Sequence, residues 1–108
     1  MVFKSQRSKD CDIQEDVKWK VWERDHQCCV VCGNPKAFPN AHFVSRAHGG
    51  LGIEQNIVTL CFKHHEQFDF GDEFSSNKVK RQIELHLKNC YEDWNINDLI
   101  YSKNNLTD

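Results

Sequence analysis

The chain has 108 residues, six cysteines and a formal net charge of −2 with the histidines neutral. This charge gives no overall attraction to nucleic acid or to an anionic membrane surface. No apolar run resembles a signal peptide or is long enough to cross a membrane, so we expect a cytoplasmic protein without a membrane partner. No repeat or linker divides the sequence, and residues 1–108 are predicted to form one domain.

The first predicted element is a helix over residues 13–25, in which apolar residues recur every fourth position from Ile13 to Val21. Two strands are predicted over residues 40–46 and 56–61, because these short segments are rich in β-branched or aromatic side chains. The glycine-rich segment between them predicts a long turn.

Two further helices are predicted after the second strand. The first covers residues 62–70 and is short. The second covers residues 76–94 and is the longest, because its apolar residues fall on one helical face. That face consists of Val79, Ile83, Leu87 and Cys90. The tryptophans are predicted to anchor the core, with stacking on bases as the alternative. They are Trp19, Trp22 and Trp94.

Two short motifs have the spacing of metal ligands: Cys29-x2-Cys32 followed by glycine, and Cys61-x2-His64. Thiols stay reduced inside cells, so such pairs are better candidates for metal binding than for disulfides. Two pairs of thiolate and imidazole ligands on tight turns suit a closed, structural zinc site. Cys28 is an alternative to Cys29 as a zinc ligand. We prefer Cys29, because a C-x2-C pair directly followed by glycine is the more typical zinc-binding turn. The alternative is that the cysteines are small buried hydrophobic residues and that His64 lies on the surface.

The segments CVVCG, AHFVSRAHGG, QNIVTLC and FKHH together resemble the HNH endonuclease family. The resemblance covers about residues 20–70, and the flanking helices are similar to those of small phage-type members with a zinc knuckle. It implies an α+β fold with a ββα-metal core, stapled by the structural zinc. Helices would flank this core on both sides, with a C-terminal helical extension at about residues 76–102.

The family carries a first histidine at the end of a strand, a central asparagine and a closing histidine on a helix. These positions match His42, Asn56 and His65. The resemblance therefore implies an enzyme that hydrolyses DNA phosphodiester bonds with a histidine base and one catalytic divalent cation. It also implies a bacterial or phage-infected host cell, and it suggests phage DNA-packaging proteins as further partners.

Phosphodiester hydrolysis needs a base to activate water and a cation to neutralise the charge that develops on the phosphate. A neutral His42 is the candidate base. His65 is the candidate ligand of a catalytic Mg²⁺, Mn²⁺ or Ni²⁺ ion. Asn56 is expected to lock the hairpin loop or to orient His42. Arg46 is a candidate phosphate clamp on DNA, with simple solvation of the arginine as the alternative.

One position departs from the family. Many members place an aspartate or a second histidine directly before the first catalytic histidine, where it binds the metal, but this chain has Ala41. Asp69 is the predicted replacement ligand, because it lies one helical turn after His65. A solvated Asp69 is the alternative, and His48 is the rival ligand.

Two functions from different classes remain open at this point. The first is the metal-dependent DNA endonuclease. The second is a zinc-stabilised module that binds DNA or protein and has lost the chemistry. The sequence leaves the oligomeric state, the target preference and the choice between nicking and double-strand cleavage open.

Overall fold

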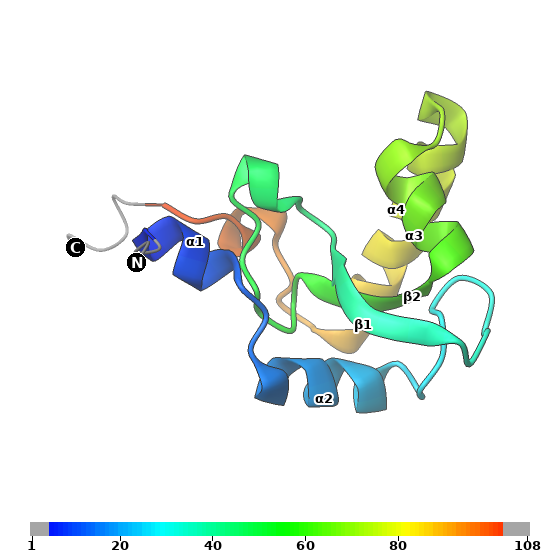
Figure 1. The fold of residues 1–108 in the computed structure, drawn as a ribbon, viewed down its shortest axis with the longest axis horizontal. Helices are drawn as coiled ribbons and strands as arrows, with labels where there is room; N and C mark the ends of the chain where they lie inside the picture. The colour runs from blue at the N-terminus through cyan, green and yellow to red at the C-terminus, as the bar shows by residue number, and fades with distance from the viewer. Residues whose placement is uncertain (1–4, 103–108) are drawn as a thin grey trace, which may run out of the picture.

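A computed structural model describes residues 5–102 of the chain (Figure 1). The ends of the predicted domain, residues 1–4 and 103–108, lie outside the described part. The elements are α1 (Gln6–Cys11), α2 (Glu15–Arg24), β1 (Ala37–His42), the 3-10 helix η1 (Arg46–His48), β2 (Ile57–Cys61), α3 (Phe62–Phe70), α4 (Glu73–Cys90) and the 3-10 helix η2 (Ile96–Leu99). The fold is α+β, as predicted. Among these elements, no helix has both the length and the apolar character required to cross a membrane.

A two-stranded antiparallel sheet forms the centre of the fold. The pairing places Ala37 opposite Cys61 and His42 opposite Ile57. In Figure 1, α2 lies on one side of this sheet, and α3 and α4 lie on the other. All residues of β2 are buried, because both faces of the strand are covered. The sheet therefore carries His42 at the end of β1 and Cys61 at the end of β2, directly before α3.

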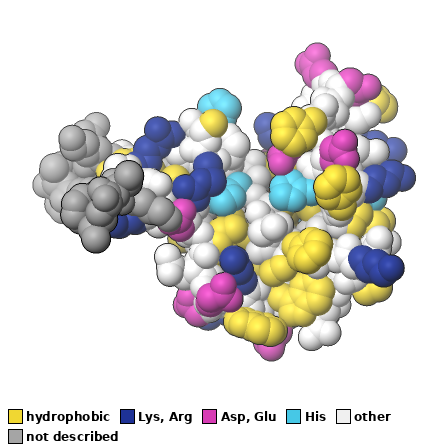
Figure 2. All heavy atoms as spheres, viewed as in Figure 1, with side chains coloured by type: hydrophobic (Ala, Val, Ile, Leu, Met, Phe, Trp, Pro, Cys, Tyr) yellow, Lys and Arg dark blue, Asp and Glu magenta, His cyan; other side chains and the backbone are white. Residues whose placement is uncertain are grey.

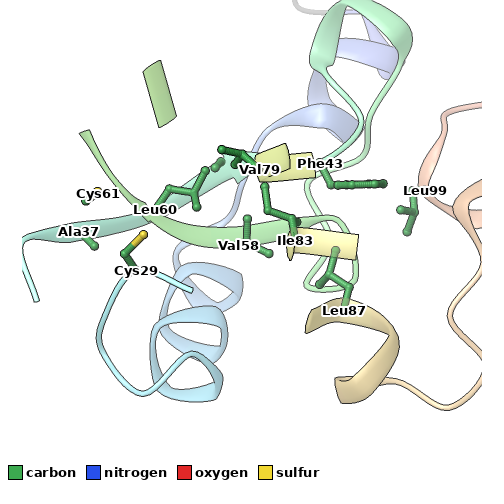
Figure 3. Close-up of a cluster of buried hydrophobic side chains, with 11 residues drawn as sticks. Cys29, Ala37, Phe43, Val58, Leu60, Cys61, Val79, Ile83, Leu87 and Leu99 are labelled. Carbon is green, nitrogen blue, oxygen red and sulfur yellow. The ribbon is translucent and has the colours of Figure 1, made fainter. Parts of the chain in front are cut away.

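The hydrophobic core joins β2 to α4. Figure 3 shows Val58 and Leu60 of β2 in the same cluster as Val79 and Ile83 of α4. The predicted core face of α4 is confirmed for the three residues Val79, Ile83 and Leu87, which are buried. Cys90, the last residue of the helix, lies on the same face and is exposed.

The tryptophans are divided between the core and the surface. Trp22 and Trp94 pack against the core, as predicted, and the Trp94 ring meets the edge of Phe43 with a centroid distance of 5.6 Å. The prediction is wrong for Trp19, which is 64% exposed. Trp19 lies at the rim of the sheet, where it lines an open depression with Phe38 and other residues instead of packing under the strands.

The strand bounds differ from the prediction on the N-terminal side of the hairpin. β1 covers Ala37–His42, whereas residues 40–46 were expected. It ends at His42 because the N–H of Val44 binds the side-chain oxygen of Asn56 at 2.8 Å instead of a partner strand. The predicted turn contains η1, and β2 begins at Ile57, one residue later than expected.

The helix bounds follow their caps. α4 begins at Glu73 and not at residue 76, because the Asp72 carboxylate accepts the N–H of Ser75 at 2.7 Å. It ends at Cys90 and not at residue 94, because Tyr91 adopts an extended backbone. The helix predicted over residues 13–25 is slightly shorter, and α3 matches its expected bounds. The short helix α1 was not predicted.

A buried carboxylate, Asp25, ties α2 to β2 and α4. It accepts hydrogen bonds from the guanidinium of Arg24 at 2.8 and 3.0 Å and from the backbone N–H of Thr59 at 2.8 Å. Its Oδ1 lies 2.7 Å from Nε2 of His86 on α4. An ionised carboxylate tolerates full burial only with such partners.

These partners determine the protonation of Asp25. Burial, the largest influence, acts to raise the pKa of Asp25, but the hydrogen bonds from His86 and Arg24 and the Arg24 charge lower it below its usual 3.8. A carboxyl group with a lowered pKa stabilises the fold above its unfolded pKa. This contribution is lost as the pH falls through the folded pKa.

Replacing the carboxylate tests this network. Asp25→Asn leaves the Arg24 guanidinium buried without its counter-charge, and breaking a buried ion pair costs about 3–5 kcal/mol. We expect a loss of that size in the free energy of unfolding, measured with urea at pH 7. The difference from the parent protein should shrink as the pH falls below about 4.

The matched control is Asp16→Asn, since Asp16 is an exposed carboxylate on the same helix. It should change the free energy of unfolding by no more than about 0.5 kcal/mol. Equal stability of the parent and Asp25→Asn proteins at pH 7 would show that the charged network does not contribute to the free energy of unfolding.

Candidate metal centre and active site

The first half of the candidate metal centre is a tight turn that carries Cys29 and Cys32. The N–H of Gly33 donates to the carbonyl of Cys29 at 2.8 Å, and the N–H of Cys29 donates to the carbonyl of Asn34 at 3.0 Å. Gly33 has φ +78°, which a residue without Cβ adopts without strain. This is why a glycine directly follows the cysteine pair.

The second half comes from the junction between β2 and α3. Cys61 is the last residue of β2 and the N-cap of α3, so His64 lies in the first turn of the helix. The N–H of Val30 donates to the carbonyl of Thr59 at 3.0 Å and fixes the cysteine turn beside β2. The fold therefore brings together two motifs that are far apart in the sequence.

The four predicted zinc ligands converge. Their ligand atoms all lie within 4.8 Å of one another. The Sγ atoms of Cys32 and Cys61 are 3.8 Å apart, and Nδ1 of His64 lies 3.2 Å from Sγ of Cys61 and 3.8 Å from Sγ of Cys29. In a tetrahedral zinc site, two sulfur ligands are about 3.8 Å apart, and a sulfur and a nitrogen about 3.5 Å. The cluster thus has the size and the donor set that a structural zinc ion requires.

The pKa shifts of Cys29 and His64 favour metal binding. The backbone hydrogen bond from Asn34 acts to lower the pKa of Cys32, but burial and the neighbouring Cys29 and Cys61 outweigh it, so this pKa is raised. Burial acts to raise the pKa of Cys29, but backbone hydrogen bonds from Cys61, Cys32 and Val31 outweigh it, so the pKa is lower than that of a free thiol. Burial, together with the charge of Lys63, lowers the pKa of His64. A thiolate and a neutral imidazole are the forms that bind zinc.

His42 lies at the end of β1, where it is partly buried. Its Nε2 is 2.8 Å from the backbone carbonyl of Cys11 in α1. A carbonyl oxygen only accepts, so Nε2 carries the hydrogen and Nδ1 of the neutral ring keeps its lone pair. Burial is the main reason why the pKa of His42 is below its usual 6.5; the hydrogen bond to the Cys11 carbonyl acts to raise it, and the charge of Arg46 lowers it further. His42 is therefore a neutral imidazole near physiological pH.

His65 and Asp69 lie one turn apart on α3, as their spacing predicts. Nε2 of His65 is 3.1 Å from Oδ2 of Asp69, and both side chains are partly exposed. The helix α3, which carries the pair, contacts β1, the strand that ends at His42. Figure 2 shows histidine side chains on both sides of a hollow between the part with η1 and the part with α3 and α4.

Asn56 is fully buried and binds the loop between the strands. Its amide nitrogen donates to the carbonyls of Val44 and Leu51 at 3.1 and 2.9 Å, and its oxygen accepts the N–H of Val44 at 2.8 Å. Of the two roles expected for Asn56, this geometry fits the lock on the hairpin loop. It makes Asn56 a positioning residue and not one of the reacting groups.

Arg46 lies in the same open depression as His42, but its guanidinium has partners within the chain. Nη1 is 2.9 Å from the Asp12 carboxylate, and Nη2 donates to the carbonyl of Ser8 at 3.5 Å. A phosphate would therefore have to share this arginine with Asp12. The role of Arg46 in DNA binding stays a prediction.

Three positions are relevant to the second protein ligand of a catalytic cation beside His65. Ala41 is completely buried within the core, so this position faces away from the surface on which His42 lies. The rival ligand His48 is exposed on η1, with Nδ1 2.7 Å from the hydroxyl of Ser45. Of the candidates, Asp69 is the one in direct contact with His65.

Sequence reasoning missed the contribution of α1 to this region. The carbonyl of Cys11 orients His42, and Asp12 pairs with Arg46. A backbone carbonyl leaves no signal in a sequence, because every residue has one. The acidic residue directly after a cysteine also fits no motif.

Comparisons of the chain with models of protein families, with curated proteins and with solved structures found no match.

The metal centre leads to a first test by elemental analysis. We expect about one tightly bound zinc per chain, because the four ligands form one complete set. Cys32→Ser should lose the zinc and unfold, since structural zinc contributes about 10–16 kcal/mol of apparent binding free energy, as much as a whole domain's stability.

Cys28→Ser is the matched control for the zinc test. Cys28 is the neighbour of Cys29, but its sulfur contacts the carbonyl of Asp25 at 3.4 Å instead of the cluster. This variant should keep its zinc and its melting temperature. If the Cys32→Ser protein stayed folded without zinc, the four residues would not be a structural zinc site.

Proposed function

We propose that the protein is a metal-dependent endonuclease of the HNH type that hydrolyses DNA phosphodiester bonds. The main support is the relation between His42 and the α3 pair His65 and Asp69. His42 is held through Nε2 by the carbonyl of Cys11, which leaves Nδ1 as the acceptor, and α3, which carries the pair, contacts the strand β1 that ends at His42. A base and a cation-binding pair are what a hydrolytic nuclease requires.

In this proposal His42 is the general base. Nδ1 accepts a proton from the attacking water, and the Nε2–H bond to the Cys11 carbonyl holds the ring in place. The same carbonyl dipole stabilises the imidazolium that forms. The water oxygen bonds to phosphorus, the bond from phosphorus to the 3′ oxygen breaks, and that oxygen takes a proton from solvent. The products carry 5′-phosphate and 3′-hydroxyl ends.

His65 and Asp69 would hold the catalytic cation. Adjacent ligands of an octahedral Mg²⁺ ion are about 3 Å apart, since each lies about 2.1 Å from the metal at a right angle. The 3.1 Å between Nε2 of His65 and Oδ2 of Asp69 is that of an ion pair, and a cation would take the place of the hydrogen between the two atoms with little change in this spacing. When bound, the ion acts as a Lewis acid on the scissile phosphate and stabilises the departing 3′ oxygen.

The alanine at position 41 does not prevent this arrangement. Mg²⁺ usually keeps several waters and is bound by one or two carboxylates together with the phosphates of the substrate. Two ligands from α3 are therefore enough when DNA supplies a third. The buried Ala41 and the Asp12 partner of Arg46 instead favour the second candidate, a zinc-stabilised DNA- or protein-binding module without activity. Incubation with plasmid and Mg²⁺, Mn²⁺ or Ni²⁺ separates the two, because only the enzyme cuts.

His42→Ala is expected to remove cleavage without unfolding the protein. A general base contributes about 10²–10⁴-fold in rate, so plasmid cleavage should fall by that factor. Bound zinc and DNA affinity should stay unchanged, since His42 belongs to neither the zinc cluster nor the core. Cleavage at the parent rate would refute His42 as the base.

The parent enzyme should show the same residue in its pH dependence. The lowered pKa of His42 predicts that cleavage declines only when the pH falls below 6.5. The rate should be measured from pH 5 to pH 8 with saturating metal, and loss of activity with a midpoint above 6.5 would contradict the assignment.

Asp69→Ala tests the proposed cation pair. Removing the carboxylate leaves His65 as the remaining ligand from α3, so the Mn²⁺ concentration for half-maximal cleavage should rise by about tenfold or more. His48→Ala is the comparison variant, and it should shift this concentration much less. Both variants should keep one zinc per chain. An unchanged Mn²⁺ requirement in Asp69→Ala would assign the missing ligand to His48 or to the DNA phosphates.

A further inference from the structure

Two exposed phenylalanines flank the proposed cation pair on α3. Phe62 is 76% exposed and Phe70 is 83% exposed. Together with His65, Glu66 and Asp69 they line one open depression. Their spacing in the sequence places all five on one stripe of the helix, with a phenylalanine at each end.

The fold does not require these aromatic side chains. α3 packs on the core through Phe68, and His64 turns towards the cysteine cluster. Phe62 and Phe70 therefore contribute little buried surface, and an exposed apolar patch at a site commonly marks an interaction surface. Figure 2 shows yellow hydrophobic groups on the surface of the part that carries α3 and α4.

The charge of the protein indicates what these rings do. Proteins that bind DNA mainly through phosphates need clusters of lysine and arginine. This chain has a net charge of −2, and the stripe itself carries the acidic Glu66 and Asp69. An aromatic ring instead stacks on the face of a base, which is worth about 1–3 kcal/mol for each base.

We propose that Phe62 and Phe70 stack on unpaired bases on either side of the scissile phosphate, so that DNA with unpaired nucleotides is the preferred substrate. This inference rests on the proposed nuclease function. A base within a duplex has both faces covered by its neighbours, so a ring that stacks on it must first unstack them, at a cost of a few kcal/mol that an unpaired strand does not impose. Phenylalanine has no hydrogen-bonding group with which to read the edges of paired bases.

The spacing along α3 fits a strand that crosses the cation pair. Phe62 and Phe70 are eight residues apart, which is about 12 Å along the helix axis. His65 and Asp69 lie between them. This length corresponds to about three to four nucleotides at the stacked rise of 3.4 Å. A phosphate bound at the centre therefore has bases within reach of a ring in both directions.

The test compares the binding of one oligonucleotide as a single strand and as a duplex. Full-length, zinc-loaded protein with His42→Ala serves as the non-cleaving parent, in Mn²⁺, and binding is followed by fluorescence anisotropy. Phe62→Leu and Phe70→Leu keep apolar side chains but remove the rings. Each should weaken single-strand binding at least about fivefold while duplex binding stays the same.

Phe38→Leu is the matched control, because Phe38 is 61% exposed and lines a different depression beside Trp19. It should leave both affinities unchanged. Single-strand affinity that survives in the Phe62→Leu, Phe70→Leu double variant would overturn the inference.

Three further outcomes would also overturn the proposal, each for a different reason. Self-association of the parent that the double variant abolishes, without a preference for single strands, would make the stripe a contact between copies of the chain. A parent with the native His42 that neither binds nor cuts any form of DNA would refute the nuclease function itself. Cleavage of duplex plasmid by an enzyme without single-strand preference would refute only the inference.

Discussion

The rotation of α3 about its axis is the constraint on which the candidate active site depends. His64 belongs to the cluster with Cys29, Cys32 and Cys61, so this side of the helix is fixed. Successive residues of a helix point about 100° apart. His65 must then face away from the cluster, and Asp69 faces the same way one turn later. The cluster of Cys29, Cys32, Cys61 and His64 thus determines where His65 and Asp69 point.

The Asp25 network supports the same arrangement from the other side of the sheet. Burying a carboxylate costs free energy unless its oxygens are hydrogen-bonded. Here the partners come from Arg24, Thr59 and His86. Arg24 also donates to the carbonyl of Ile57, the first residue of β2. The network therefore fixes β2 between α2 and α4, and β2 leads directly into Cys61 and α3. Strand and helix positions that apolar packing alone would leave adjustable are specified by directional bonds.

The features that the sequence predicts are those whose signal is local. The zinc ligands form two close pairs, the core face of α4 repeats every four residues, and Asp69 follows His65 by one turn, so spacing alone was informative. The features that it missed depend on the fold. The partners of Asp25 come from three separate elements, and the carbonyl that orients His42 belongs to Cys11. α1 is too short to show a periodic pattern, and its cap is a single serine hydroxyl.

The surface of α3 at the candidate site is acidic, and this determines how it could bind DNA. Around α3 the acidic residues Glu66 and Asp69 would repel a phosphate unless a cation lies between them and the DNA. In the proposed enzyme, the catalytic cation is then also a requirement for productive substrate binding. A phosphate would then be held beside His42 only in the metal-bound state, and the proposed hydrolysis would be confined to that state.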